Sequence, residues 1–332
     1  MRKPAHLRLS KTWISTVSFV LGSLLLLFLV WRIGIDALAH DLKHAGPYVF
    51  WIMVLSGLRY YLRTVGWAAA YMPDEQHRRS GLFGLQLAGD ALAYLSSAGP
   101  FLGEPLKATL VRDVNTSDSL GSTLLDNFIY TLTAFAVTLS GLVVLAVLPF
   151  IAKAHANAIA IGALLCSLLA VSAFIGWQRV ALPKALSWLG GKTGHRWQQL
   201  RERLEAIAAR MERINTQRPF ALWTIFLLAV VAQILILAEV ALALRPSEVS
   251  FSFASLLVIE GATKLVKALF FFIPGRVGAD EGSSAAIVSL LGMGPATGLI
   301  LSVIRRVRAI LWAFVGLGYL AYHAGRIRAQ SA

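Results

Sequence analysis

Long apolar blocks divide this sequence, and they restrict its possible folds more than any other feature. Six blocks cover residues 13–31, 47–70, 120–148, 157–177, 220–244 and 296–322. Each is about as long as the roughly 20-residue helix that crosses the hydrocarbon core of a bilayer. Moreover, 14% of the residues are charged, against about 25% in soluble domains. The sequence therefore predicts an all-α polytopic membrane protein with about six full spans.

The net charge of +14 is distributed as in a membrane protein. Four Lys or Arg residues precede the first apolar block, and nine more lie within residues 178–218. Basic residues of this kind gather in cytoplasmic loops. We therefore expect a multi-pass protein of the cytoplasmic (inner) membrane, with both the N-terminus and the C-terminus in the cytoplasm. Membrane lipids are the expected partners, and nucleic acid is not.

Two segments interrupt the apolar sequence with Gly and Pro. They read Gly99-Pro100-Phe101-Leu102-Gly103-Glu104-Pro105 and Pro274-Gly275-Arg276-Val277-Gly278-Ala279-Asp280-Glu281. The ten residues 103–112 that complete the first segment make about 15 Å of helix, which is too short to cross. We therefore expect residues 81–112 to form a re-entrant hairpin from the cytoplasmic side. Residues 251–292 form a second hairpin from the other side, although residues 251–273 are also long enough to span completely.

Paired Gly/Pro-interrupted segments in the two halves of a chain are typical of inverted-repeat transporters, whose site lies between the repeats. We therefore expect residues 1–332 to form one integral membrane domain, with two re-entrant or broken-helix hairpins in a pseudo-inverted repeat. Between the halves, residues 178–218 form a cytoplasmic amphipathic loop. Its apolar residues recur every three or four positions, so we expect a helix on the lipid surface, or alternatively in a coiled-coil contact.

Ionisable residues inside apolar segments mark the candidate site, because such charges are rare and usually face a bundle interior or a pathway. Glu260 and Lys264 are spaced to neutralise each other on one helix face. Arg305, Arg306 and Arg308 have few acids near them in the sequence, so an anionic lipid head group is their expected partner; snorkelling to the interface is the alternative. The candidate cavity residues are Asp90, Gly99, Pro100, Gly103, Glu104, Pro105, Lys107, Asp126, Glu260, Lys264, Pro274, Gly275, Arg276, Gly278, Asp280, Glu281, Arg305 and Arg306.

A simpler explanation exists for some of the acidic residues. Glu104, Asp280 and Glu281 stand near the starts of short helices, where a carboxylate is stabilised by the helix dipole. Capping explains the acidity but not two backbone breaks at membrane depth, which are tolerated only where protein or a water-filled cavity surrounds them.

Motifs for cofactor or nucleotide chemistry are missing from the sequence. There is no Walker A loop, no H-E-x-x-H, no G-x-S-x-G and no metal-spaced His or Cys cluster. The single cysteine, Cys166, lies inside an apolar block. We therefore expect no cofactor, no metal site, no catalytic residue and no ATP-driven pumping.

The two interrupted segments resemble the signatures of a known family. Leu87-Ala88-Gly89-Asp90 followed by residues 99–107, and residues 274–282 followed by residues 290–297, are similar to the two signatures of the lysylphosphatidylglycerol synthase transmembrane (flippase-like) family. In its best-known members this membrane domain moves an aminoacylated phospholipid between leaflets, ahead of a soluble aminoacyl-transferase domain. The resemblance implies a stand-alone member without that domain, similar to the hopanoid-biosynthesis-associated membrane proteins. It also implies cavity roles for Glu104, Pro105, Lys107, Gly278 and Glu281.

Three functions remain open from the sequence. The first is flippase- or scramblase-like translocation of an anionic or modified phospholipid or isoprenoid lipid. The second is an integral-membrane enzyme that modifies lipid head groups with Glu104, Asp280 or Glu281 as general base. The third is a non-catalytic partner for a lipid-synthesis enzyme docked on residues 178–218. The pair Ala279-Asp280 stands where the family resemblance implies a larger or basic pair, which leaves the cargo open.

Overall fold

The computed structural model describes residues 35–72, 81–95, 100–111, 114–150, 153–190, 195–218, 220–270, 273 and 276–331. Within these ranges, the side chains of residues 35–44, 177–196 and 323–331, and of some others, are also outside the description. The first apolar block, residues 13–31, is not described. The described residues are almost entirely helical and contain no strand, which confirms the predicted all-α class.

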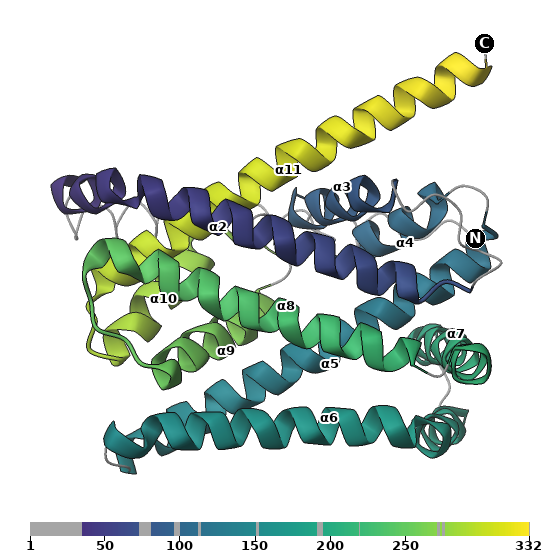
Figure 1. Cartoon of the computed structure of the whole chain (residues 1–332), viewed down its shortest axis with the longest axis horizontal. Helices are drawn as coiled ribbons and strands as arrows, with labels where there is room; N and C mark the ends of the chain where they lie inside the picture. Colours follow the sequence, from purple (N-terminus) through teal and green to yellow (C-terminus); the bar gives the residue numbers. More distant parts are fainter. Residues whose placement is uncertain are drawn as a thin grey trace.

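Five long helices run roughly along the long axis of the molecule (Figure 1). They are α2 (Ile35–Ala69), α5 (Thr116–Val147), α6 (Lys153–Gly190), α8 (Ala221–Leu244) and α11 (Pro295–Ser331). Short 3-10 turns, η2 (Leu148–Phe150) and η3 (Arg245–Ser247), follow α5 and α8. Helices α5, α6 and α8 contain stretches that are long and apolar enough to cross a membrane. Helices α2 and α11 are long enough, at 35 and 37 residues, but carry several arginines.

Four short helices form two consecutive pairs. The first pair is α3 (Leu82–Leu95) with α4 (Pro100–Leu110), and the second is α9 (Phe253–Leu269) with α10 (Ala279–Leu290). Since the longest has 17 residues, none exceeds about 26 Å, less than the roughly 30 Å of a hydrocarbon core. The α3/α4 pair lies in the half of the molecule that also holds α7, and the α9/α10 pair lies in the opposite half (Figure 1).

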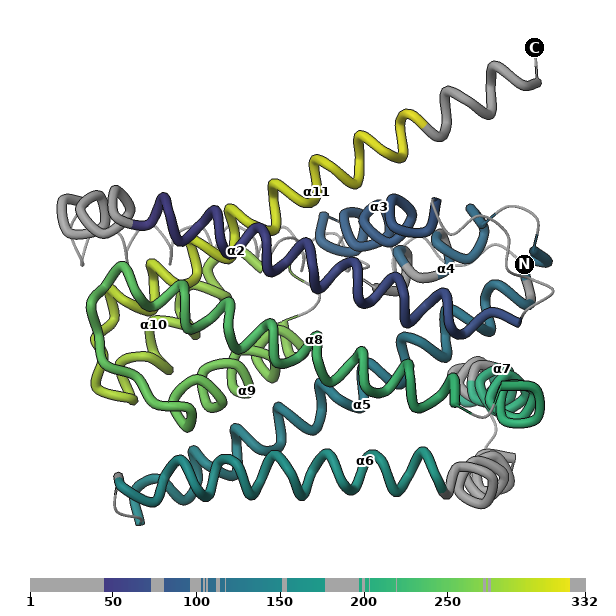
Figure 2. The backbone as a smooth tube through the Cα atoms, viewed as in Figure 1, coloured from purple at the N-terminus to yellow at the C-terminus, as the bar shows by residue number. Residues whose placement is uncertain are grey.

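Helix α11 contacts both short pairs, through α3 and α10 (Figure 2). Glycines allow the backbones to meet at these two crossings. A Cβ atom on Gly298 would lie 2.3 Å from the carbonyl oxygen of Ser284 in α10, and one on Gly316 would lie 2.3 Å from that of Leu87 in α3. The cationic segment of α11 around Arg306 lies between these crossings.

The amphipathic segment of the 178–218 loop forms α7 (His195–Gln217), as its periodicity predicts. This helix lies across the ends of α5, α6 and α8 (Figure 1). Its apolar residues Ile207, Met211 and Ile214 are buried and belong to a core cluster that includes Leu125 and Ile225. The prediction that this face lies on lipid is therefore wrong for its buried residues, which pack on protein.

Candidate functional site

A cavity of about 270 Å³ lies among α2, α3, α9, α10 and α11. Six of its lining residues are basic, and we call them the cavity cations: Arg59, Lys267, Arg276, Arg305, Arg306 and Arg308. The two acidic lining residues are Asp90 and Asp280. The lining also includes six hydroxyl side chains, those of Tyr60, Tyr94, Thr263, Ser283, Ser284 and Ser302. Such a surface favours an anionic ligand.

Glutamates behind the cavity hold the arginines of α11. Arg305 pairs with Glu260 of α9, with 2.5 Å between Nη2 and Oε2. Arg306 pairs with Glu281 of α10, with 2.5 Å between Nη2 and Oε1. An α-helix has 3.6 residues per turn, so the neighbouring residues Arg305 and Arg306 point to different sides of α11. Their carboxylate partners therefore come from different helices.

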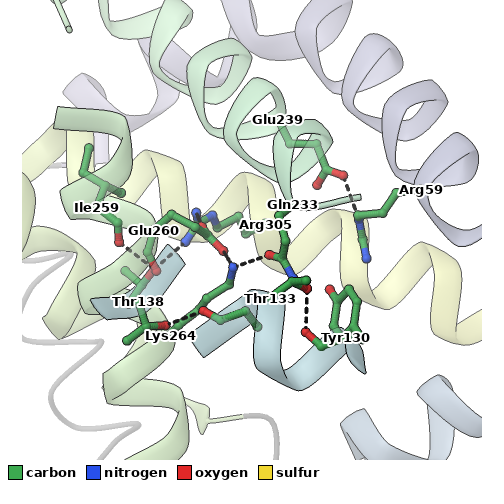
Figure 3. Close-up of polar contacts among 12 residues, drawn as sticks. Arg59, Tyr130, Thr133, Thr138, Gln233, Glu239, Ile259, Glu260, Lys264 and Arg305 are labelled. Carbon is green, nitrogen blue, oxygen red and sulfur yellow. Dashed lines mark hydrogen bonds and ion pairs between the residues drawn. The ribbon is translucent and has the colours of Figure 1, made fainter. Parts of the chain in front are cut away.

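A third glutamate, Glu239 of α8, pairs with two arginines. Its Oε1 lies 3.0 Å from Nε of Arg59 on α2, and its other oxygen pairs with Arg308 of α11. Figure 3 shows the Arg59–Glu239 contact between α2 and α8. We call Glu239, Glu260 and Glu281 the wall glutamates. The carboxylate partners of Arg305, Arg306 and Arg308 therefore come from segments distant in the sequence. The expectation that an anionic lipid head group also binds these arginines stays a prediction.

The predicted pairing of Glu260 with Lys264 is present, with 3.4 Å between Oε1 and Nζ. Lys264 also donates a hydrogen bond to Oε1 of Gln233 on α8, so Lys264 and Arg305 both reach Glu260 (Figure 3). Neither Glu260 nor Lys264 lines the cavity among the described side chains. Glu260 instead contacts Arg305 from behind the cavity wall.

The α3/α4 pair reaches the cavity through α3. Asp90 lines it and accepts a hydrogen bond from Nε2 of Gln86, at 3.2 Å. Lys107 of α4, 1% exposed, donates to Oε1 of the same Gln86, at 3.2 Å. Gly103 packs on Gly89 instead. A Cβ atom added to Gly103 would lie 2.4 Å from the carbonyl oxygen of Gly89. Pro105 is exposed.

Some predicted site residues lie outside the description. Gly99, Pro274 and Gly275 are not described, nor are the side chains of Pro100 and Glu104.

The second interrupted segment shapes the cavity wall at the start of α10. Gly278, in a positive-φ conformation that suits glycine, donates its N–H to Oε2 of Glu281 at 2.7 Å. Glu281, 1% exposed, therefore caps the helix and pairs with Arg306, so the capping explanation holds for Glu281 but is incomplete. It is wrong for Glu104, because α4 already begins at Pro100 and has no acidic residue in its first turn. Asp280 lies 3.5 Å from Nε of Arg276 through Oδ2. Its buried Oδ1 has no hydrogen-bond partner among the described residues.

Asp126 belongs to a separate polar contact. Its Oδ2 lies 3.0 Å from Nη2 of Arg63, and the guanidinium of Arg63 stacks 3.7 Å from the ring centre of Tyr130. This pair joins α5 to α2 and does not line the cavity.

The candidate cavity residues do not include several of the lining residues. Lys267 and Arg308 carry the same sequence signal as the candidates, an ionisable residue inside an apolar segment, and Arg308 lies two residues after Arg306. Arg59 lies in the second apolar block, and its position there was the available signal. The lining residues with hydroxyl groups cannot be recognised in the sequence, because serine and threonine are common in membrane helices. Their hydroxyls often donate to a carbonyl oxygen of their own helix, as those of Ser302 and Thr263 do.

The described residues contain no group of three or more His, Cys, Asp or Glu side chains that could hold a metal ion. What they offer chemically is an array of guanidinium and ammonium groups, oriented by carboxylates behind them. Preorganised groups of this kind bind phosphate oxygens well.

Comparisons with known proteins return one match. No curated protein and no solved structure matches significantly. The family described as "Lysylphosphatidylglycerol synthase TM region" matches residues 15–318. Because this match covers most of the chain, the protein belongs to the lysylphosphatidylglycerol synthase TM region family.

Proposed function

We propose that this protein translocates a lipid, an anionic or modified phospholipid or an isoprenoid lipid, across the cytoplasmic membrane. The observation that carries the proposal is the cavity lined by six cations inside a bundle of membrane-spanning length. Buried charges cost several kcal/mol each unless they are compensated. A membrane protein whose buried charges line one cavity provides a polar path for a lipid head group.

The arrangement of the short helices supports a transporter architecture. No single helix of either pair is long enough to cross, and the two pairs lie in opposite halves of the bundle (Figure 1). A re-entrant hairpin from each side, related as an inverted repeat, accounts for both features. The 17-residue length of α9 favours the re-entrant interpretation of the second pair over a complete crossing. The cavity then lies where the two repeats meet.

The size of the cavity fits a head group better than a whole lipid. Sites for small molecules measure roughly 300–1,000 Å³, so about 270 Å³ suits a phosphorylated head group. Acyl chains would stay in the surrounding bilayer. Because no nucleotide motif is present, we propose passive or ion-coupled movement.

Ion pairing in the cavity wall disfavours the alternative of a lipid-modifying enzyme. The candidate bases Asp280 and Glu281 pair with Arg276 and Arg306. A carboxylate that took up a proton from a substrate would give up its ion pair, and the arginine would be left without its counter-charge. We therefore propose translocation rather than catalysis. In a deletion strain, altered sidedness of a lipid would support this proposal, and loss of a lipid species would favour the enzyme.

The direct test blocks the cavity with a large side chain. Ala309 lines the cavity on α11, so Ala309→Trp fills space that a head group would need. Ala158 on the outer face of α6 is exposed, and Ala158→Trp is the matched control. The measurement is the accessibility of fluorescent phosphatidic acid, an anionic phospholipid, to a membrane-impermeant quencher in proteoliposomes.

We expect the parent protein and Ala158→Trp to equilibrate the leaflets at the same rate. Ala309→Trp should fall to the rate of protein-free vesicles while keeping the elution profile of the folded protein. Equal rates for Ala309→Trp and the parent would exclude the cavity as the route.

A further inference from the structure

The carboxylates around the cavity do not balance its cations. We consider the described lining residues, their ion-pair partners, and Lys264, which shares Glu260. This group contains seven cations, namely the six cavity cations and Lys264. It contains five carboxylates, namely Asp90, Asp280 and the three wall glutamates. Two positive charges therefore remain in excess, and in a membrane interior such an excess calls for a counter-charge.

The excess positive charge of the cavity is located at Lys267. It lies on α9, one turn after Thr263, and both residues line the cavity. The five cavity arginines each have a carboxylate within ion-pair distance. Among the described residues, Lys267 alone of the cavity cations has no such partner. An ammonium group carries three donors, so this side chain can bind a ligand oxygen without first breaking an ion pair.

The charge of the ligand follows from the size of the excess. A terminal phosphate group carries about −1.5 to −2 charges near pH 7, because its second pKa is about 6. A phosphodiester such as phosphatidylglycerol carries one negative charge, and a zwitterionic head group carries none in sum. An aminoacylated head group would add a positive charge to a site that already has an excess of positive charge. Of these four kinds of head group, the terminal phosphate is the one that matches an excess of two.

We propose that the cavity selects a lipid whose head group ends in a terminal phosphate, and that Lys267 is the residue that distinguishes it from a phosphodiester. This inference rests on the proposed function, since it places a lipid head group in the cavity. Lys267 binds the phosphate oxygen that a diester would carry as an ester. N–H groups of the paired arginines bind the remaining oxygens.

The test compares two lipids that differ by one charge and one methyl group. Dioctanoyl phosphatidic acid and its methyl ester, dioctanoyl phosphatidylmethanol, are titrated into the purified protein in detergent. We expect the acid to bind about tenfold tighter or more, the gain from one added charge-assisted hydrogen bond. Lys267→Met should remove this preference and Lys267→Arg should keep it. Arg201→Gln, an exposed change on α7, is the control and should leave the preference unchanged.

Equal affinity for the two lipids in the parent protein would overturn the inference, and so would an unchanged preference in a folded Lys267→Met variant. Glycerol 3-phosphate serves as a competitor without acyl chains. If it displaces the lipid at the same concentration as phosphatidic acid, the ligand is a soluble phosphate compound and the lipid assignment is wrong.

The leaflet assay separates this inference from the proposed function. A protein that equilibrates leaflets through the cavity but binds both lipids equally refutes the inference alone. A protein that prefers phosphatidic acid but moves no lipid refutes translocation, and supports a terminal-phosphate site.

Discussion

At the scale of single residues, Glu239 pairs with two of the cavity arginines although it lies outside both interrupted segments. It is 3% exposed, lies in the most apolar part of the bundle, and pairs with both Arg59 and Arg308. Removing one partner of a buried ion pair is costly, because the remaining charge keeps its desolvation penalty and loses its compensation. In this case one substitution would leave two guanidinium groups without a counter-charge.

We therefore expect Glu239→Gln to lower the free energy of unfolding by about 3–5 kcal/mol. The matched control is Glu205→Gln, which breaks the exposed Arg201–Glu205 pair on α7 and should cost about 1 kcal/mol or less. The measurement is denaturant unfolding of both variants in the same detergent. Similar losses in the two variants would mean that the buried pairs contribute no more than a surface pair.

The residues of the site divide by how far apart in the sequence their partners lie. Glu260 and Lys264, or Arg276 and Asp280, are four residues apart on one helix, and such pairs can be predicted from spacing. Arg59 and Glu239 are 180 residues apart, and nothing local to either indicates the other. The sequence therefore predicts that Arg305 and Arg306 are functional, but not what orients them.

At the scale of helices, close crossings depend on glycine. Helices α5 and α9 meet at Gly141 and Gly261, where a Cβ on Gly141 would lie 2.3 Å from the carbonyl oxygen of Leu257. Small residues at such positions let membrane helices approach to backbone contact. Since α9 carries Glu260 and Lys267, this crossing sets the position of one cavity wall.

Gly141→Ala should push α5 and α9 apart and destabilise the protein by about 1–3 kcal/mol, as overpacked core substitutions do. Gly162 on α6 is the control, because an added Cβ there meets no atom within 4 Å. Gly162→Ala should be neutral or stabilise the protein by up to about 1 kcal/mol, from helix propensity. Thermal unfolding of the two variants measures the change in stability. Changes of the same sign and size in both variants would contradict the prediction.

Helix boundaries were more predictable than helix neighbours. The break before α10 is specified locally, because Pro and Gly both disfavour a continuous helix. The periodicity of α7 likewise predicts its existence. It does not say which apolar surface the helix covers, because the interior of a bundle and the edge of a bilayer attract the same side chains. The buried Met211 shows which of the two prevails.

At the scale of the whole molecule, the loop before α9 and the end of α10 lie at the end of the bundle opposite α7 (Figure 1). This arrangement is what two hairpins entering from opposite sides require. It also assigns sides to surface positions. Ser250, before α9, and Ser289, near the end of α10, are both exposed, as are Thr116 at the start of α5 and Thr216 on α7.

The last prediction uses these four positions in a background in which Cys166, which is exposed, is replaced by alanine. In intact cells, a membrane-impermeant maleimide should label Ser250→Cys and Ser289→Cys, because α9 and α10 return the chain to the side it came from. Thr116→Cys and Thr216→Cys should be labelled only after the membrane is opened, because α7 lies in the basic loop that we place in the cytoplasm. Labelling of Ser250→Cys without Ser289→Cys would mean that α9 and α10 together cross the membrane once, and the inverted repeat would then be wrong. Labelling of all four in intact cells would show that the sides assigned from the basic residues are wrong.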